Sequence, residues 1–328
     1  MSGPVPATLR LGTRRSALAM AQARSVVDAI TAGTGRPVEL VEVTTYGDVS
    51  REALAQIGGT GVFVNAIREA LLDGRVDLAV HSLKDLPTKD PEGLLLAAVP
   101  QRADPRDALV ARDGLTLAEL PPGARVGTGS PRRAAQLQML GYGLHVVPIR
   151  GNVDTRMRMV TEGELDAVVL ARAGLARLGK LDAMTEPLDP AQMLPAPGQG
   201  ALAVECSADP ASAALVDLLS GLDDAPTRAA VTAERALLAT LEAGCSAPVG
   251  ALAESAEGEE FPELYLRAVV VGGASAAPAA PAGPDDGTAR SVRMSATGPL
   301  DDAELLGRRL ASEMLAEGAA GLIGERVP

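Results

Sequence analysis

The sequence predicts an α/β protein, with two similar α/β domains followed by a smaller α+β domain. Its 328 residues are roughly two to three times the ~100–150 residues of a typical domain. Short apolar strands alternate with helical segments over the first two thirds of the chain, which favours largely parallel sheets covered by helices. After about residue 222, one long helical segment precedes several strand-like runs, which indicates a third domain of another type.

The first domain is expected to begin with a strand at 8–13. Ser16 can cap the following helix, whose apolar side chains fall on one face. The remaining predicted elements are a strand at 38–45, a glycine-rich loop at Gly58–Gly61, a helix near 63–72 and a strand at 76–81.

The second domain repeats this alternation from about residue 103. Its predicted elements are strands at 107–111, 125–128, 145–150 and 166–170, and helices near 115–120, after Ser130, near 153–162 and near 173–178. Ser130 is the expected N-cap and Pro131 the first residue of its helix. The Pro- and Gly-rich segment 195–200 should form a turn, and the strand at 201–206 is expected to return to the first domain.

The third domain is predicted to contain a helix near 226–242, strands near 248–253, 263–271 and 291–297, and a helix near 301–317. Residues 273–287 have low complexity and are expected to form a flexible insertion. The domain boundaries are therefore placed at 1–102 plus about 200–220, at 103–199 and at 221–328.

Composition excludes several classes of function. A net charge of −12, with two Phe, three Tyr and no Trp, argues against nucleic-acid binding. The two cysteines have no partners at metal-ligand spacing, so neither a metal site nor a disulfide framework is expected. The N-terminus has no apolar signal core and no run is long enough to span a membrane, which predicts a cytoplasmic protein.

Arginine dominates the positive charge, with 27 arginines and three lysines. Pairs of arginines follow four predicted strands, where parallel sheets bind ligands: Arg14 and Arg15, Arg132 and Arg133, Arg150 and Arg156, and Arg172 and Arg177. Guanidinium groups bind carboxylates and phosphates in pairs of hydrogen bonds, so these clusters indicate a ligand with several negative charges. Surface positions or local salt bridges are the alternative, and a phosphate ligand stays open although no P-loop is present.

The Lys84–Asp85 pair and the two cysteines are considered for chemistry. Asp85 and Lys84 follow the strand at 76–81, either as an exposed ion pair or with Asp85 as a buried carboxylate directed at a cation formed during reaction. Cys206 ends an apolar strand and is expected to be buried. Cys245 lies in a turn of small residues, where its thiol is either inert or accessible for chemistry.

Nine segments together resemble the hydroxymethylbilane synthase (porphobilinogen deaminase) family over nearly the whole chain. They are Thr13–Ser16, Gly58–Phe63, His81–Pro87, Asp104–Ala108, Gly127–Arg133, Arg150–Arg156, Pro195–Ala201, Thr232–Arg235, and Gly244–Cys245 with Pro248. The resemblance implies two lobes like those of periplasmic binding proteins, a smaller C-terminal domain and a monomer. It also implies a dipyrromethane cofactor, made from porphobilinogen and joined to Cys245 by a thioether.

The family reaction joins four porphobilinogen molecules. Each loses ammonia to give an azafulvenium cation, the cofactor's outer pyrrole attacks this cation, and water finally releases linear hydroxymethylbilane. The resemblance assigns catalysis to Asp85. It assigns cofactor contacts to Ser82, Lys84, Thr128, Ser130, Arg132, Arg133 and Gln199, and substrate contacts to Arg14, Ser16, Arg150, Arg156 and Arg177.

This chain departs from the family in a few places. Gln56 and Thr60 stand where many relatives have lysines in the glycine-rich loop, and Ala243 and Ala247 are small changes near Cys245. Two other functions fit the same architecture: a non-catalytic anion- or amino-acid-binding protein with an arginine-lined cleft, and a phosphoryl-binding enzyme.

Overall fold

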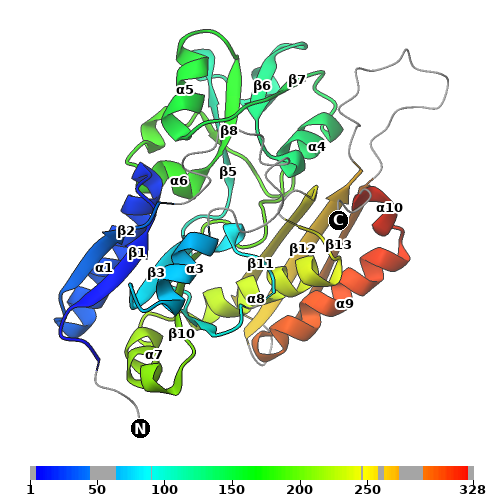
Figure 1. The fold of residues 1–328 in the computed structure, drawn as a ribbon. Helices are drawn as coiled ribbons and strands as arrows, with labels where there is room; N and C mark the ends of the chain where they lie inside the picture. Colours follow the sequence, from blue (N-terminus) through cyan, green and yellow to red (C-terminus); the bar gives the residue numbers. More distant parts are fainter. Residues whose placement is uncertain are drawn as a thin grey trace.

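The fold is described from a computed structural model (Figure 1). The structure describes residues 5–44, 64–89, 91–244, 247–257, 262–272 and 291–323. Predictions for the loop Gly58–Gly61, for Gln56 and Thr60, for Cys245 and for the insertion 273–287 lie outside these ranges. Among the described residues, no helix is long and apolar enough to span a lipid bilayer.

The first lobe is built on a five-stranded sheet. Its strands, in spatial order, are β2 (Val38–Glu42), β1 (Leu9–Thr13), β3 (Leu78–Ser82), β10 (Leu202–Ser207) and β4 (Leu94–Ala98). The first three are parallel, whereas β10 runs antiparallel to both β3 and β4. The helices of this lobe are α1 (Ala17–Thr34), α3 (Asn65–Leu72) and α7 (Ala213–Ser220). The strand predicted at 201–206 therefore does return to the first sheet, which confirms that prediction.

The second lobe has a sheet of similar design. Its strands, in spatial order, are β7 (His145–Pro148), β6 (Arg125–Thr128), β8 (Ala167–Ala171), β5 (Asp107–Ala111) and β9 (Glu186–Pro187). The first three are again parallel, and β5 is antiparallel to both of its neighbours. The helices are α4 (Pro131–Met139), α5 (Val153–Thr161) and α6 (Arg172–Arg177). The helix predicted near 115–120 is instead a short 3₁₀ turn, Leu117–Glu119, closed by a capping box between Thr116 and Glu119.

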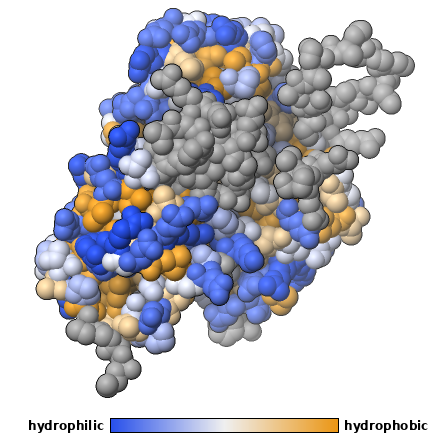
Figure 2. All heavy atoms as spheres, in the orientation of Figure 1, coloured by the Kyte–Doolittle hydropathy of each residue, from blue (hydrophilic) through white to orange (hydrophobic). Residues whose placement is uncertain are grey.

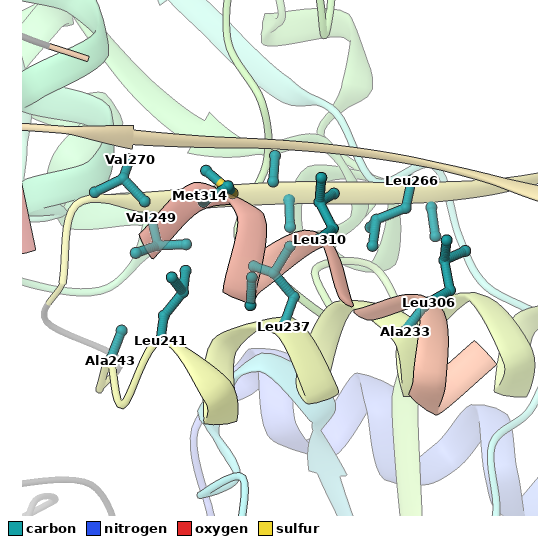
Figure 3. Close-up of a cluster of buried hydrophobic side chains, with 14 of the residues drawn as sticks. Ala233, Leu237, Leu241, Ala243, Val249, Leu266, Val270, Leu306, Leu310 and Met314 are labelled. Atoms are coloured by element: carbon teal, nitrogen blue, oxygen red, sulfur yellow. The ribbon is translucent and has the colours of Figure 1, made fainter. Parts of the chain in front are cut away.

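The C-terminal part is an antiparallel sheet covered by helices. Its strands are β11 (Val249–Glu257), β12 (Pro262–Val271) and β13 (Ser291–Pro299), and its helices are α8 (Ala225–Thr240), α9 (Ala303–Ala316) and α10 (Ala320–Ile323). Leu237 of α8, Leu310 of α9 and Leu266 of β12 are fully buried in the core between them (Figure 3). Figure 2 shows hydrophilic and hydrophobic residues interspersed over one face of the molecule.

The structure confirms the mixed α/β class with a third α+β unit, but it corrects the expected sheet type. The sequence predicted largely parallel sheets, and both lobes have mixed sheets. The reason is that β10 in the first lobe and β5 in the second run antiparallel to both of their neighbours. Strand β4 was not predicted from the sequence. Cys206 is fully buried in β10, as expected.

Candidate active site

Asp85 lies at the carboxyl end of a buried strand of the first lobe. Strand β3 continues into a 3₁₀ turn, Leu83–Asp85. The buried side chain of Leu83 and its N–H bond to the Ala201 carbonyl (3.1 Å) fix this turn against the core. The Asp85 side chain is exposed and makes no hydrogen bond or ion pair with any other described residue. Its carboxylate is therefore available to a ligand.

Lys84, in the same turn, contacts Gln199 from the segment that connects the two lobes. Its Nζ atom lies 3.4 Å from Oε1 of Gln199. Burial lowers the pKa of Lys84 to about 8; the negative charge of Asp85 opposes this shift and the positive charge of Arg133 adds to it. The neighbouring Ser82 accepts a hydrogen bond from Nε2 of Gln22 on α1 (2.7 Å).

Arg132 and Arg133, at the start of α4, are buried around one carboxylate. Oδ2 of Asp107 accepts a hydrogen bond from Arg132 Nη1 (2.7 Å), and Oδ1 accepts bonds from Arg133 Nε (3.0 Å) and Nη2 (2.8 Å). Gln199 Nε2 donates to the same Oδ1 atom at 2.8 Å. Burial raises the pKa of Asp107, but the two guanidinium groups outweigh burial and hold that pKa below its usual range.

Both arginines keep hydrogen-bonding capacity beyond this carboxylate. Arg132 also donates to the Leu194 carbonyl (2.6 Å), and Arg133 donates to the Val169 carbonyl (3.0 Å). Nε of Arg132 is buried without a hydrogen-bond partner among the described residues. Since buried polar atoms are nearly always paired, this atom indicates a missing partner.

Thr128 and Ser130 form the turn that leads from β6 into α4. The Thr128 hydroxyl accepts a bond from the Ser130 N–H (3.2 Å), and the Ser130 hydroxyl caps α4 by accepting from the Arg133 N–H (3.4 Å). At Gly129 a Cβ atom would lie only 2.6 Å from the Ile149 carbonyl oxygen. The sequence therefore forms a tight turn here, which brings the end of β6 against the end of β7.

The remaining predicted arginines differ in their surroundings. Arg150 is exposed, and Arg156 is half-buried with Nε donating to the Gly151 carbonyl (2.8 Å). Burial, with the nearby charges of Arg133 and Arg150, lowers the pKa of Arg156. Arg177 donates to the Gly200 carbonyl (2.7 Å). Neither Arg156 nor Arg177 has an ion-pair partner in the described part of the chain.

These contacts show which predicted residues the fold brings together. Lys84, Gln199 and Arg133 meet at one point, although they come from three distant segments, and Arg177 contacts the residue next to Gln199. Ser16 caps α1 by accepting from the Ala19 N–H (3.3 Å), and Arg14 is partly buried just before it. Arg172 is paired with Asp104 (3.1 Å), so the local salt-bridge alternative holds for this arginine.

A second buried cluster, which sequence reasoning missed, joins the C-terminal domain to this junction. Glu234 of α8 is fully buried and accepts hydrogen bonds from Arg102 Nη1 (2.6 Å) and Nη2 (3.0 Å), from the Gly198 N–H (2.6 Å) and from the Ala253 N–H (2.8 Å). Arg102 Nε in turn donates to the Gln199 carbonyl (2.8 Å). The sequence signal for Glu234 was the family match at Thr232–Arg235, but the resemblance assigned no role to these residues.

Cys245 lies outside the described residues, whereas its flanks are described. The N–H of Ala247 donates to the Gly244 carbonyl at 2.9 Å. A cavity of about 300 Å³ separates the residues before Cys245 from the segment after Asp85. Its walls are Leu86 to Lys89 on one side, and Leu238, Ala239 and Glu242 to Gly244 on the other.

Comparison with models of protein families shows to which family this chain belongs. Residues 9–214 match the model described as "Porphobilinogen deaminase, dipyromethane cofactor binding domain", and residues 228–277 match "Porphobilinogen deaminase, C-terminal domain". The chain belongs to the porphobilinogen deaminase family. A porphobilinogen deaminase 1 from Streptomyces coelicolor is 62% identical over 97% of this chain and 98% of its own length. A porphobilinogen deaminase from Thermobifida fusca is 54% identical over 96% of both chains.

Solved structures give a weaker similarity. The methionine-binding protein MetQ aligns with 66% of this porphobilinogen deaminase family chain and 90% of its own, at 15% identity and a TM-score of 0.41. A periplasmic substrate-binding protein of an ABC transporter from Coxiella burnetii aligns with 65% of this chain and 91% of its own, at 16% identity and a TM-score of 0.42. TM-scores this low support no conclusion about function.

The residues of this chain fit the cofactor of the porphobilinogen deaminase family, whose pyrroles carry acetate and propionate groups. Two features suit such a polyanion. The buried Nε of Arg132 has no hydrogen-bond partner among the described residues, and the guanidinium groups of Arg156 and Arg177 have no described carboxylate partner. The cavity is lined by Gly244, which directly precedes in sequence the cysteine that the resemblance names for attachment. Its other wall directly follows Asp85.

Proposed function

We propose that the chain catalyses the hydroxymethylbilane synthase reaction of tetrapyrrole biosynthesis. Four porphobilinogen molecules and one water give one linear hydroxymethylbilane and four ammonia molecules. The observation that carries this proposal is the exposed carboxylate of Asp85, which has no ion-pair partner among the described residues, next to Lys84 and the cations of the lobe junction in a chain of this family. A substrate with two carboxylates whose pyrrole ring becomes positively charged when ammonia leaves needs both features.

Asp85 is the proposed catalytic residue. Its carboxylate can accept hydrogen bonds from pyrrole N–H groups and can stabilise positive charge that develops as the C–N bond to the departing ammonia breaks. No described residue forms a hydrogen bond or an ion pair with the Asp85 carboxylate, although its charge acts on the neighbouring Lys84. The 3₁₀ turn, anchored through Leu83, holds the carboxylate in place before substrate binds.

The cationic and polar residues are proposed to hold carboxylates of cofactor and substrate. We assign Ser82, Lys84, Thr128, Ser130, Arg132, Arg133 and Gln199 to the cofactor, and Arg14, Ser16, Arg150, Arg156 and Arg177 to the substrate. The shared counterion Asp107 supports this division, because it fixes Arg132, Arg133 and Gln199 as one rigid group. Arg150 and Arg156 lie in and after the turn that follows β7 and are less constrained.

Cys245 is proposed to carry the dipyrromethane cofactor through a thioether. When bound, this cofactor supplies the nucleophilic pyrrole carbon on which the chain is extended. The small residues Ala243 and Gly244 leave room next to the cavity that faces the Asp85 segment. Membership of the porphobilinogen deaminase family supports porphobilinogen as the substrate. A cytoplasmic location, no binding to nucleic acid or membranes, and a monomeric state remain predictions from the sequence.

Substitution of Asp85 tests this proposal. In Asp85→Ala, turnover of porphobilinogen should fall by at least ~10²-fold, because an electrostatic contact to the transition state is removed. The melting temperature should stay close to that of the wild type, since the Asp85 side chain is exposed. Ammonia release and product formation are measured in parallel.

Asp182→Ala serves as a control, because Asp182 is a carboxylate in a short 3₁₀ turn of the second lobe away from the junction. Near-normal turnover by Asp85→Ala would refute the catalytic assignment. A wild-type protein that takes up ligand reversibly and releases no ammonia would favour the binding-protein alternative.

A further inference from the structure

Arg235 of α8 binds the backbone of the segment that follows Asp85. Its Nη2 atom donates to the Pro87 carbonyl at 2.8 Å and lies 3.4 Å from the Thr88 carbonyl, and its Nη1 atom lies 3.4 Å from the Leu86 carbonyl. Three consecutive carbonyls of the first lobe thus converge on one guanidinium of the C-terminal domain. A planar group with five N–H donors suits such a set, whereas an ammonium group cannot match its shape.

The same helix leads to the cofactor-attachment site. The cavity of about 300 Å³ is lined by Leu238 and Ala239 of α8, which ends at Thr240, and by Glu242 to Gly244, which precede Cys245 in the sequence. The opposite wall is the segment that Arg235 holds. Helix α8 therefore contacts the Asp85 segment through Arg235, and the residues Glu242 to Gly244 that follow it line the facing wall of the cavity.

We propose that Arg235 is a positioning residue, which sets the distance between the carboxylate of Asp85 and the cofactor-bearing turn. This inference rests on the proposed function. Arg235 acts on Asp85 through the backbone carbonyls of residues 86–88. A displacement of about 1 Å between reacting groups can lower a rate by about 10²-fold, so the loss of this contact should affect kcat more than substrate binding.

Arg235→Gln tests the inference, because glutamine is also polar but cannot reach three carbonyls with a planar fork. The expected result is a kcat lower by roughly tenfold or more, with KM for porphobilinogen within about twofold of the wild type. Arg235→Lys should recover part of kcat, since the ammonium can still donate to the Pro87 carbonyl. Intact-protein mass spectrometry should show the same cofactor mass on both variants as on the wild type.

Arg228→Gln is the matched control. Arg228 lies on the same helix and its Nη2 atom also donates to carbonyls of the first lobe, but those of Leu96 (3.4 Å) and Ala97 (3.3 Å) in β4 and not those of the Asp85 segment; its Nε also pairs with Asp223 (2.7 Å). This variant should lose similar thermal stability and keep wild-type kcat. Equal losses of kcat in Arg228→Gln and Arg235→Gln would show that only domain packing matters and would overturn the inference.

An Arg235→Gln enzyme with wild-type kcat would overturn the inference as well. If Arg235→Gln does not fold, the decision rests on Arg235→Lys, which must then show a lowered kcat at unchanged KM. A wild-type protein without porphobilinogen turnover would instead refute the proposed function, so the two failures are distinguishable.

Discussion

Arg132 and Arg133 share one buried counterion, and this arrangement affects how they can bind an anion. Removing two guanidinium groups and a carboxylate from water is costly, and the hydrogen bonds of Asp107 offset that cost only in part. The trio keeps one net positive charge, and Lys84 adds a second near Gln199. The junction is therefore held in a cationic state before any ligand arrives, which favours a polyanionic cofactor.

Lys84 gives this site a testable dependence on pH. Its ammonium group loses its proton as the pH rises through about 8, the value to which burial lowers its pKa. The rate at which cofactor-free protein, incubated with porphobilinogen, gains the cofactor mass should therefore fall above pH 8, by up to about tenfold per pH unit. In Lys84→Arg this fall should move to higher pH, because arginine stays charged up to a pKa of about 12.5.

Mass spectrometry of samples taken over time between about pH 7 and 9.5 measures this rate. Lys180→Arg is the control, since Lys180 pairs with Asp154 in the second lobe. An unchanged pH profile in Lys84→Arg would contradict the role given to Lys84.

Individual residues were predictable from the sequence to different degrees. The position of Asp85 at a strand end followed from the apolar run before it, but the expectation of a buried carboxylate was wrong, because the Asp85 side chain is exposed. The burial of Arg132 and Arg133 was not predictable, because their counterion Asp107 is more than twenty residues away in the sequence. The pairing of Glu234 with Arg102 was not predictable either, because the two residues lie far apart in the sequence.

At the scale of elements, the close packing of α8 and α9 depends on one glycine. A Cβ atom at Gly307 would lie 2.1 Å from the Ala233 carbonyl oxygen and 2.9 Å from Ala236 Cβ. Gly307→Ala should therefore force the helices apart and lower the free energy of unfolding by about 1–3 kcal/mol. Urea denaturation measures this change.

Gly33→Ala is the matched control for this prediction. Gly33 lies in α1 with nothing within 4 Å of the added methyl group, so alanine should raise the free energy of unfolding by about 0.5–1 kcal/mol. If Gly307→Ala were as stable as the wild type, the helix contact would not be as close as described.

Most helices and strands were predictable, because caps and periodicity are local signals. Ser16 and Ser130 cap α1 and α4 as expected, and the elements of both lobes follow in the predicted order. The direction of strand pairing was not predictable. Alternating strands and helices favour parallel sheets, but β10 and β5 enter their sheets antiparallel through connections that cross between the lobes. The direction of these two strands is determined by the tertiary arrangement of the chain.

On the scale of the whole molecule, the segment 195–200 is the point where the three sheets meet. Gln199 contacts Lys84 of the first lobe and Arg133 and Asp107 of the second, while its neighbour Gly198 binds Glu234 of the C-terminal domain. We therefore propose the domain boundaries expected from the sequence, 1–102 plus about 200–220, 103–199 and 221–328. The order of strands in the three sheets supports them.

The central claim is that Cys245 carries a cofactor built from the protein's own substrate. Intact-protein mass spectrometry of freshly purified protein tests it most directly, beside a Cys245→Ser variant and with peptide mapping of any added mass. The account predicts an adduct of two linked porphobilinogen-derived pyrroles on Cys245 that is absent from the variant. An unmodified Cys245 that stays unmodified after incubation with porphobilinogen would contradict it.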